Sequence, residues 1–291
     1  MSFDLQTWFV FIAVPFGIVM IGAGTCWNVD HGARERAPTA SSPVVRWSSV
    51  TLAFAWWLAA AVTVFASAAP AWWAVEGWPK SVWPMLAGVA LTAVQWNTSR
   101  GDFPLRWVVF GWIAVAAAFL AMPLGESWAD MQSLHRPWMA AITLAITCNA
   151  FALHLMAQRG TQRWLPLVIL ASLACPAIIG AASYSALLQA CLGAIIATSA
   201  IAIVALTGRL PTSPAIMFPS VLFMAPMVAA GRFYSYAEVP PFAYGIALFA
   251  PTLIALADRL VVDRATSVRV ATSASAAILI VGITTYQFLL S

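Results

Sequence analysis

The side chains that could carry out chemistry lie in short segments between long apolar runs. Arg232 opens the segment Arg-Phe-Tyr-Ser-Tyr-Ala-Glu-Val-Pro-Pro, and a guanidinium among aromatic rings can hold a phosphate or carboxylate headgroup. His135 and Glu126 could act as acid and base if they folded together. Because no spacing here matches a known catalytic motif, solvated loop residues are the simpler interpretation, and the catalytic residues stay unassigned.

The motifs of several enzyme and cofactor classes are absent from the sequence. It contains no His-Glu-x-x-His, no Gly-x-x-x-x-Gly-Lys and no Gly-x-Ser-x-Gly. The spacings of the four cysteines match no zinc or redox motif. The three histidines, His31, His135 and His154, are too dispersed to pair as haem ligands. We therefore expect no cofactor and no metal, and a protein that is not an enzyme is the favoured class.

Composition indicates a membrane protein. The chain of 291 residues is 62% hydrophobic and 8% charged, whereas an average soluble domain is about 25% charged. Lipid must cover most of such a surface, and backbone groups facing lipid need partners within their own segment, which favours helices. The net charge of +4 comes from scattered basic residues with no cluster that could follow a nucleic-acid backbone. We expect an all-α, polytopic bundle that contacts membrane lipids and no nucleic acid.

Apolar periodicity and length predict about ten spans in a single integral membrane domain. We place them at Leu5–Cys26, Val45–Ala69, Ser81–Trp96, Trp107–Met122, Trp138–Ala157, Leu165–Tyr184, Ser185–Leu206, Ala215–Gly231, Phe242–Ala257 and Val270–Leu290. The apolar stretch from 165 to 206 would form one helix of about 60 Å, twice the hydrocarbon core, so it must turn back. Its small polar residues at 182–185 predict the turn. The segment Trp27–Pro43 is expected to be a flexible, solvated loop.

Basic residues separate by loop once these spans are drawn. Eleven of the fourteen fall in one alternate set of loops, and the other set holds only Lys80, Arg136 and Arg232. The arginine-rich side should be cytoplasmic, which places both termini outside. Short loops and small-residue packing suit a bacterial inner membrane.

Tryptophans gather where spans meet the headgroups. Trp72, Trp73, Trp78 and Trp83 crowd the second loop, and indole rings favour the interface between lipid and water. We expect them to anchor the helix ends there.

Ten spans could divide into inverted halves, 1–164 and 165–291, a plan that many carriers share. Pro15 in the first span and Pro176 in the sixth are each followed by small residues, and proline frees a helical carbonyl. Paired interruptions of this kind point to a midplane binding site.

Few polar groups lie deep in the spans. Gln95, Asn149 and Gln189 are the amides there, and no charged residue lies near the middle of any span. Ion-coupled pumps usually place an ionisable group at that depth, so its absence makes such a mechanism less favoured. With Pro15, Pro176 and Arg232, the three amides form the set of candidate substrate-binding residues, although hydrogen bonding between helices is the simpler role for each amide.

Three functions stay open from the sequence. The first is a small carrier or permease for an uncharged or amphipathic solute. The second is a non-catalytic membrane subunit, which requires a protein partner. The third is an enzyme that acts on a lipid-linked substrate at the outer leaflet.

Overall fold

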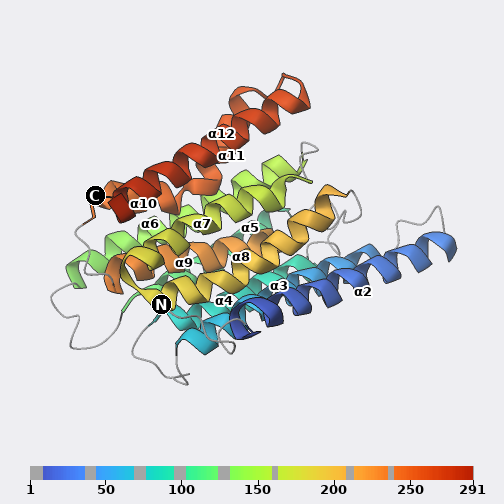
Figure 1. The fold of residues 1–291 in the computed structure, drawn as a ribbon, viewed down its shortest axis with the longest axis horizontal. Coiled ribbons are helices and arrows are strands. Elements are labelled where there is room, and N and C mark those ends of the chain that lie inside the picture. Colours follow the sequence, from blue (N-terminus) through green and yellow to red (C-terminus); the bar gives the residue numbers. More distant parts are fainter. Residues whose placement is uncertain are drawn as a thin grey trace.

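The computed structural model is all-helical in the residues that it describes. Those residues are 9–36, 44–68, 77–94, 103–123, 132–158, 163–207, 213–234 and 239–290. The first half comprises η1 (Phe9–Ala13), α2 (Val14–Arg36), α3 (Val44–Ser67), η2 (Trp78–Ser81), α4 (Val82–Val94), α5 (Phe103–Ala121) and α6 (Gln132–Gln158). The second half comprises α7 (Leu165–Ser183), α8 (Ser185–Leu206), η4 (Ser213–Ile216), α9 (Met217–Tyr234), α10 (Pro241–Leu248), α11 (Ala250–Leu260), α12 (Thr266–Thr285) and η5 (Tyr286–Leu290). Figure 1 shows these helices as one elongated bundle.

Six helices of the described chain are long and apolar enough to cross a membrane, and the bent pair α10 and α11 would make a seventh. They indicate an integral membrane protein of the multi-pass kind. The helix α5 is apolar but shorter over Leu105–Ala121. The predicted number of ten spans and the inverted halves stay predictions. In matched halves, the contact of α12 with α7 in the second half would have a counterpart between α6 and α2 in the first half. The structure shows the contact of α12 with α7 but no major contact between α6 and α2, so helix packing does not favour matched halves.

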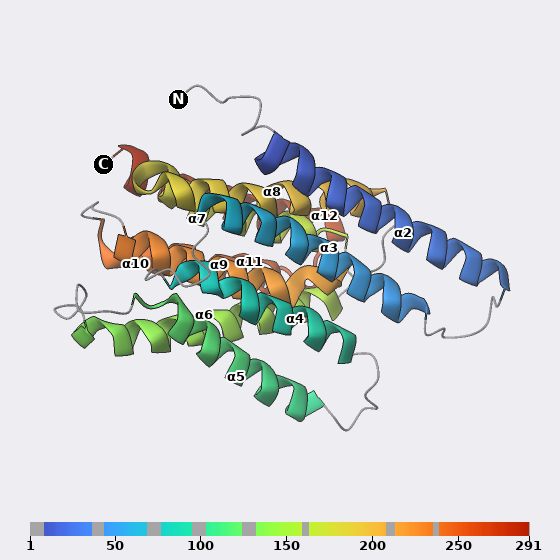
Figure 2. The same cartoon turned by 90° about the horizontal axis from the view of Figure 1, so that it is seen from below.

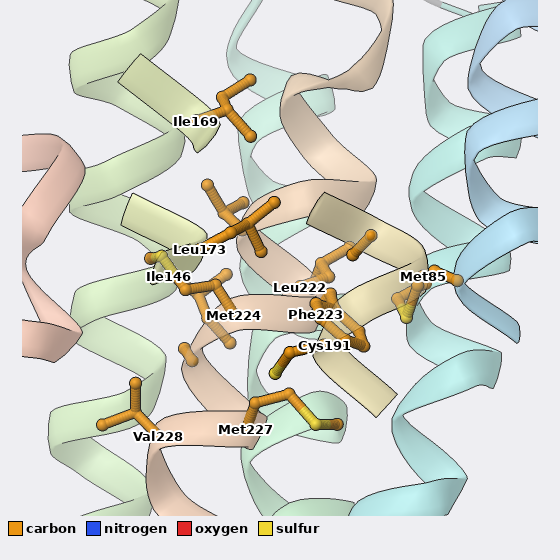
Figure 3. Close-up of a cluster of buried hydrophobic side chains, with 14 of the residues drawn as sticks. Met85, Ile146, Ile169, Leu173, Cys191, Leu222, Phe223, Met224, Met227 and Val228 are labelled. Atoms are coloured by element: carbon orange, nitrogen blue, oxygen red, sulfur yellow. The ribbon is translucent and has the colours of Figure 1, made fainter. Parts of the chain in front are cut away.

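The helix α9 forms the centre of the bundle. Its residues from Met217 to Gly231 are all buried, and it packs against α4, α5, α6, α7, α8 and α10. A helix that is apolar on every side is stable only when other helices surround it. Figure 3 shows the middle of this core, where Met224 and Met227 of α9 meet Leu173 of α7 and Cys191 of α8.

Small residues allow the helices to approach closely. At the crossing of α3 and α8, a side chain on Gly193 would collide with Thr63. The Thr63 hydroxyl donates a hydrogen bond to the Ala190 carbonyl (3.0 Å), and Trp56 Nε1 donates to the Thr198 hydroxyl (2.8 Å). These contacts match the packing expected of membrane helices, in which small residues and hydroxyls lie at the interface.

The predicted turn between the sixth and seventh spans is confirmed. The helix α7 ends at Ser183, Tyr184 has an extended backbone, and α8 begins at Ser185. Two other expectations were wrong. The helix α2 continues to Arg36, into the segment expected to be a flexible loop. Trp78 is fully buried and packs edge-on against Tyr184 at 6.1 Å, so it is a core residue, and its ring has no exposed surface that could anchor in the headgroups.

The two ends of the bundle differ in charge (Figures 1 and 2). We call one end the arginine-rich end, because five of the described arginines lie where α5, α7 and α12 begin or α11 ends: Arg106, Arg163, Arg259, Arg264 and Arg269. The opposite end carries Lys80, Arg136 and Arg232. The described chain also begins and ends at this opposite end. The basic residues thus separate by end as the loop assignment predicts.

Candidate functional site

One span in the second half of the chain is broken. The axes of α10 and α11 differ by 63°, and the break lies at Phe249. Pro251 follows it in the first turn of α11, where a proline is tolerated because its missing N–H would have no helical partner. Phe249 donates to the Gly245 carbonyl at 3.1 Å and accepts from the Leu253 N–H at 2.9 Å. The break therefore leaves chiefly the Leu248 carbonyl and the Thr252 N–H without a partner in their own helices.

Asn149 of α6 satisfies groups on both sides of this break. Its Nδ2 donates to the Leu248 carbonyl at 2.8 Å, at the end of α10. Its Oδ1 accepts from the backbone N–H of Thr252 at 3.2 Å and from the Thr252 hydroxyl at 2.7 Å, in the first turn of α11. The Asn149 side chain is fully buried. One amide therefore caps two helix ends at once, because an amide carries both a donor and an acceptor.

A buried ion pair links α11 to α12. Arg269 donates from Nε to Asp258 Oδ1 at 3.0 Å and from Nη2 to Oδ2 at 2.8 Å, which is the bidentate geometry of a strong arginine–carboxylate pair. The Asp258 side chain is 1% exposed and the Arg269 side chain 9% exposed. Such a pair keeps the end of α11 and the beginning of α12 together, because separating the partners would leave buried charges unpaired.

A cavity of about 230 Å³ lies beside this pair at the arginine-rich end. Its other walls come from the end of α6, the first turn of α7 and the inward face of α12, and they include Met156, Leu167, Ser273 and Ala277. Ile278, which is 73% exposed, lies at its border, so the cavity opens to the outer surface of the bundle. An apolar cavity of about 150 Å³ already holds a benzene-sized molecule. The arrangement can hold a small molecule that has an apolar body and one polar group.

Arg232 lies in an aromatic cluster at the opposite end. Its guanidinium is 5.8 Å from the centre of the Tyr244 ring, and that ring contacts Trp138 at 6.2 Å. His135 packs edge-on against Phe233 at 5.6 Å, and within the described chain its Nε2 is buried without a hydrogen-bond partner. The cluster places His135 and Arg232 at the same end, as expected. Glu126, the suggested partner of His135, lies outside the described residues, so the acid–base pair stays a prediction.

The remaining candidate residues lie apart from one another. Pro15 is buried in the first turn of α2, directly after the π-helical turn η1, and Pro176 is buried within α7, which continues unbroken past it. Gln189 is half-buried on α8. Gln95 lies outside the described residues. Of the deep amides, Asn149 is the one that the structure places at an interruption of a helix.

Sequence reasoning missed the Asp258–Arg269 pair and the cavity beside it. The charge pattern assigns Arg269 to a loop, where it indicates orientation, and it gives Asp258 no role. An isolated acidic residue at the end of an apolar run, with an arginine eleven positions later, is the signal that could have indicated a pair across a helical hairpin.

No metal site is evident in the parts of the chain that the structure describes, where no three His, Cys, Asp or Glu side chains gather as ligands could. The four cysteines are free thiols, and three of them are buried. Buried thiols of this kind act as small apolar packing residues.

Comparisons with protein-family models, with curated proteins and with solved structures gave no match to this chain.

Proposed function

We propose that the protein is a carrier that moves an amphipathic solute across a membrane, and that the cavity beside Asp258 and Arg269 binds the solute. The observation that carries this proposal is the broken span, because α11, the half-helix that follows the break, carries Asp258 of the cavity wall near its far end. Discontinuous helices near the bilayer midplane are a feature of many carriers.

The depth of the break supports the proposal. Asn149 lies nine residues before the end of α6, which corresponds to about 13 Å along the helix. Half of a hydrocarbon core is about 15 Å, so a break at this level lies near the middle of the membrane. The irregular backbone at Phe249 is tolerated there because Asn149 satisfies its polar groups.

The packing of α12 suggests which part moves. Only 22% of the residues in its span are buried, compared with 61% in α7. Segments with few buried apolar contacts open at the lowest free-energy cost. Because the ion pair ties α12 to α11, the two helices would move together as one arm about the break at Phe249. Such a motion would open and close the cavity that the arm covers.

The chemistry of the cavity defines the solute class. Most of its wall is aliphatic, and the polar groups on it are Ser273, Asp258, Arg269 and the indole of Trp164. A solute with an apolar body and one charged or hydrogen-bonding group fits this distribution, because the body removes apolar surface from water while the group meets the ion pair.

The test is native mass spectrometry of gently extracted protein, followed by uptake of any retained compound into proteoliposomes. Ser273→Trp should fill the cavity and remove both retention and uptake. Ser267→Trp is the matched control, because this exposed serine of α12 does not line the cavity. Equal retention by the two variants would contradict the proposed site. A stoichiometric second polypeptide, with no uptake, would support the membrane-subunit alternative instead.

A further inference from the structure

A second apolar groove, of about 370 Å³, runs along a different side of α11 between α11 and α6. Cys148, Phe151 and Leu155 line it from α6, and Thr252, Leu256 and Arg259 line it from α11. Each set follows the spacing that places helical residues on one face. The groove therefore runs lengthwise between two helices, with Thr252 towards its deep end and Arg259 at the arginine-rich end.

The groove opens to the outside of the bundle, where lipid would lie. Phe151 is 45% exposed and Leu256 is 55% exposed, and both line the groove. Seven residues separate Thr252 from Arg259, which is about 10 Å along α11. That length is about two thirds of one leaflet of the hydrocarbon core. Its dimensions and apolar walls match part of a single acyl chain.

The charge at the mouth of the groove, which is the end where Arg259 lies, favours a lipid headgroup that carries a negative charge. Arg259 is exposed and forms no ion pair with any residue that the structure describes. The adjacent Asp258 is already paired with Arg269. Arg259 is the one charged residue among the described residues that line the groove, so the groove wall carries a net positive charge. A guanidinium binds phosphate oxygens through two parallel hydrogen bonds.

We propose that the groove between α6 and α11 binds an anionic phospholipid, with one acyl chain between Phe151 and Leu256 and the headgroup phosphate against Arg259. This inference requires only that the bundle lies in a membrane, and it does not depend on the carrier function. An anionic lipid is favoured over a zwitterionic one because the latter carries its own cation, which the positive mouth repels.

The experiment measures lipid retention by native mass spectrometry. The full chain is reconstituted in vesicles of equal amounts of phosphatidylglycerol and phosphatidylcholine with the same acyl chains, and the bound lipids are counted after extraction. We expect one retained phosphatidylglycerol, enriched about fivefold over phosphatidylcholine, the factor expected for one arginine near a membrane surface.

Two variants and one control make the result specific. Arg259→Gln should abolish the enrichment, while Arg264→Gln, an equal loss of charge in the next turn that does not line the groove, should keep it. Ala152→Phe should fill the groove and reduce retention of both lipids. Equal enrichment in Arg259→Gln and Arg264→Gln, or equal retention of the two lipids by the unmodified protein, would overturn the proposal.

Discussion

Asn149 is the single residue on which the geometry of the broken span depends most directly. It bonds to both half-helices, to the Leu248 carbonyl at the end of α10 and to Thr252 in the first turn of α11. Asn149→Ala should lower the free energy of unfolding by about 1 to 3 kcal/mol, because it leaves buried backbone groups without partners. Unfolding in a mixed-detergent titration measures this change.

Thr147 provides the matched control for Asn149. It lies two positions earlier on α6 and its hydroxyl bonds only within its own helix, to the Thr143 carbonyl at 2.8 Å. Thr147→Ala should therefore change the free energy of unfolding by less than Asn149→Ala. If the two substitutions lower the free energy of unfolding equally, the Asn149 amide does not stabilise the break between α10 and α11.

The Asp258–Arg269 pair gives a second prediction at the residue scale. Arg269→Met alone should lower the free energy of unfolding by about 3 to 5 kcal/mol, since it leaves the buried carboxylate of Asp258 unpaired. Asp258→Leu combined with Arg269→Met should recover most of that loss, because the double variant leaves no charge in the site. A double-mutant cycle with the same titration measures both values. A double variant that is less stable than either single variant would show that the two residues do not act as a pair.

The sequence predicted some of these residues and missed others for a physical reason. Asn149 stood out because an amide is rare at that depth in an apolar run. Its partners, Leu248 and Thr252, lie at a bend 99 or more positions later, and no sequence pattern indicates such a contact. The pairing of Asp258 with Arg269 depends on how sharply α11 turns into α12, which charge counting does not address.

At the scale of elements, the lengths of the apolar runs in the sequence predicted where most helices lie. The bounds of α8 agree with the predicted span, and the turn at Tyr184 followed from the simple fact that one helix would have been too long. The bend between α10 and α11 could not be predicted in this way, because Phe242–Ala257 is apolar on both sides of the break. Pro251 marks the break, but prolines at 137, 176 and 226 lie within helices that continue.

The crossing of α3 and α8 supplies a prediction for helix packing. Gly193→Ala should lower the free energy of unfolding by about 1 to 3 kcal/mol, because the added methyl group would collide with Thr63 and Ala59. Gly282→Ala is the control, since a methyl group at this position of α12 meets no atom within 4 Å. It should leave stability unchanged or raise it by about 0.5 to 1 kcal/mol, the helix preference of alanine over glycine. Equal losses for the two variants would contradict close packing at the crossing.

At the scale of the whole molecule, charge and helix direction together predict the topology. The arginine-rich end should face the cytoplasm, and the end where η1 and η5 lie should face outwards. Alkaline phosphatase fused after Leu290 should be active, because the enzyme folds only outside the cytoplasm, and the same reporter fused after Asp263 should be inactive. The reverse pattern would show the opposite orientation in the membrane. Equal activity at both fusion sites would show that α12 does not cross the membrane.

The central claim is that α11 and α12 move as one arm and expose the cavity to each side of the membrane in turn. The most direct measurement is the reactivity of a single cysteine at Ala277, which lines the cavity and lies about 12 Å along α12 from Arg269. The four native cysteines are replaced by alanine, and a membrane-impermeant thiol reagent is added to one side of proteoliposomes or to the other. The carrier account predicts that Ala277→Cys reacts from both sides, whereas Ser267→Cys, at the exposed beginning of α12, reacts only from the arginine-rich side. Reaction of Ala277→Cys from one side only would contradict alternating access and leave the cavity as a static feature of the bundle.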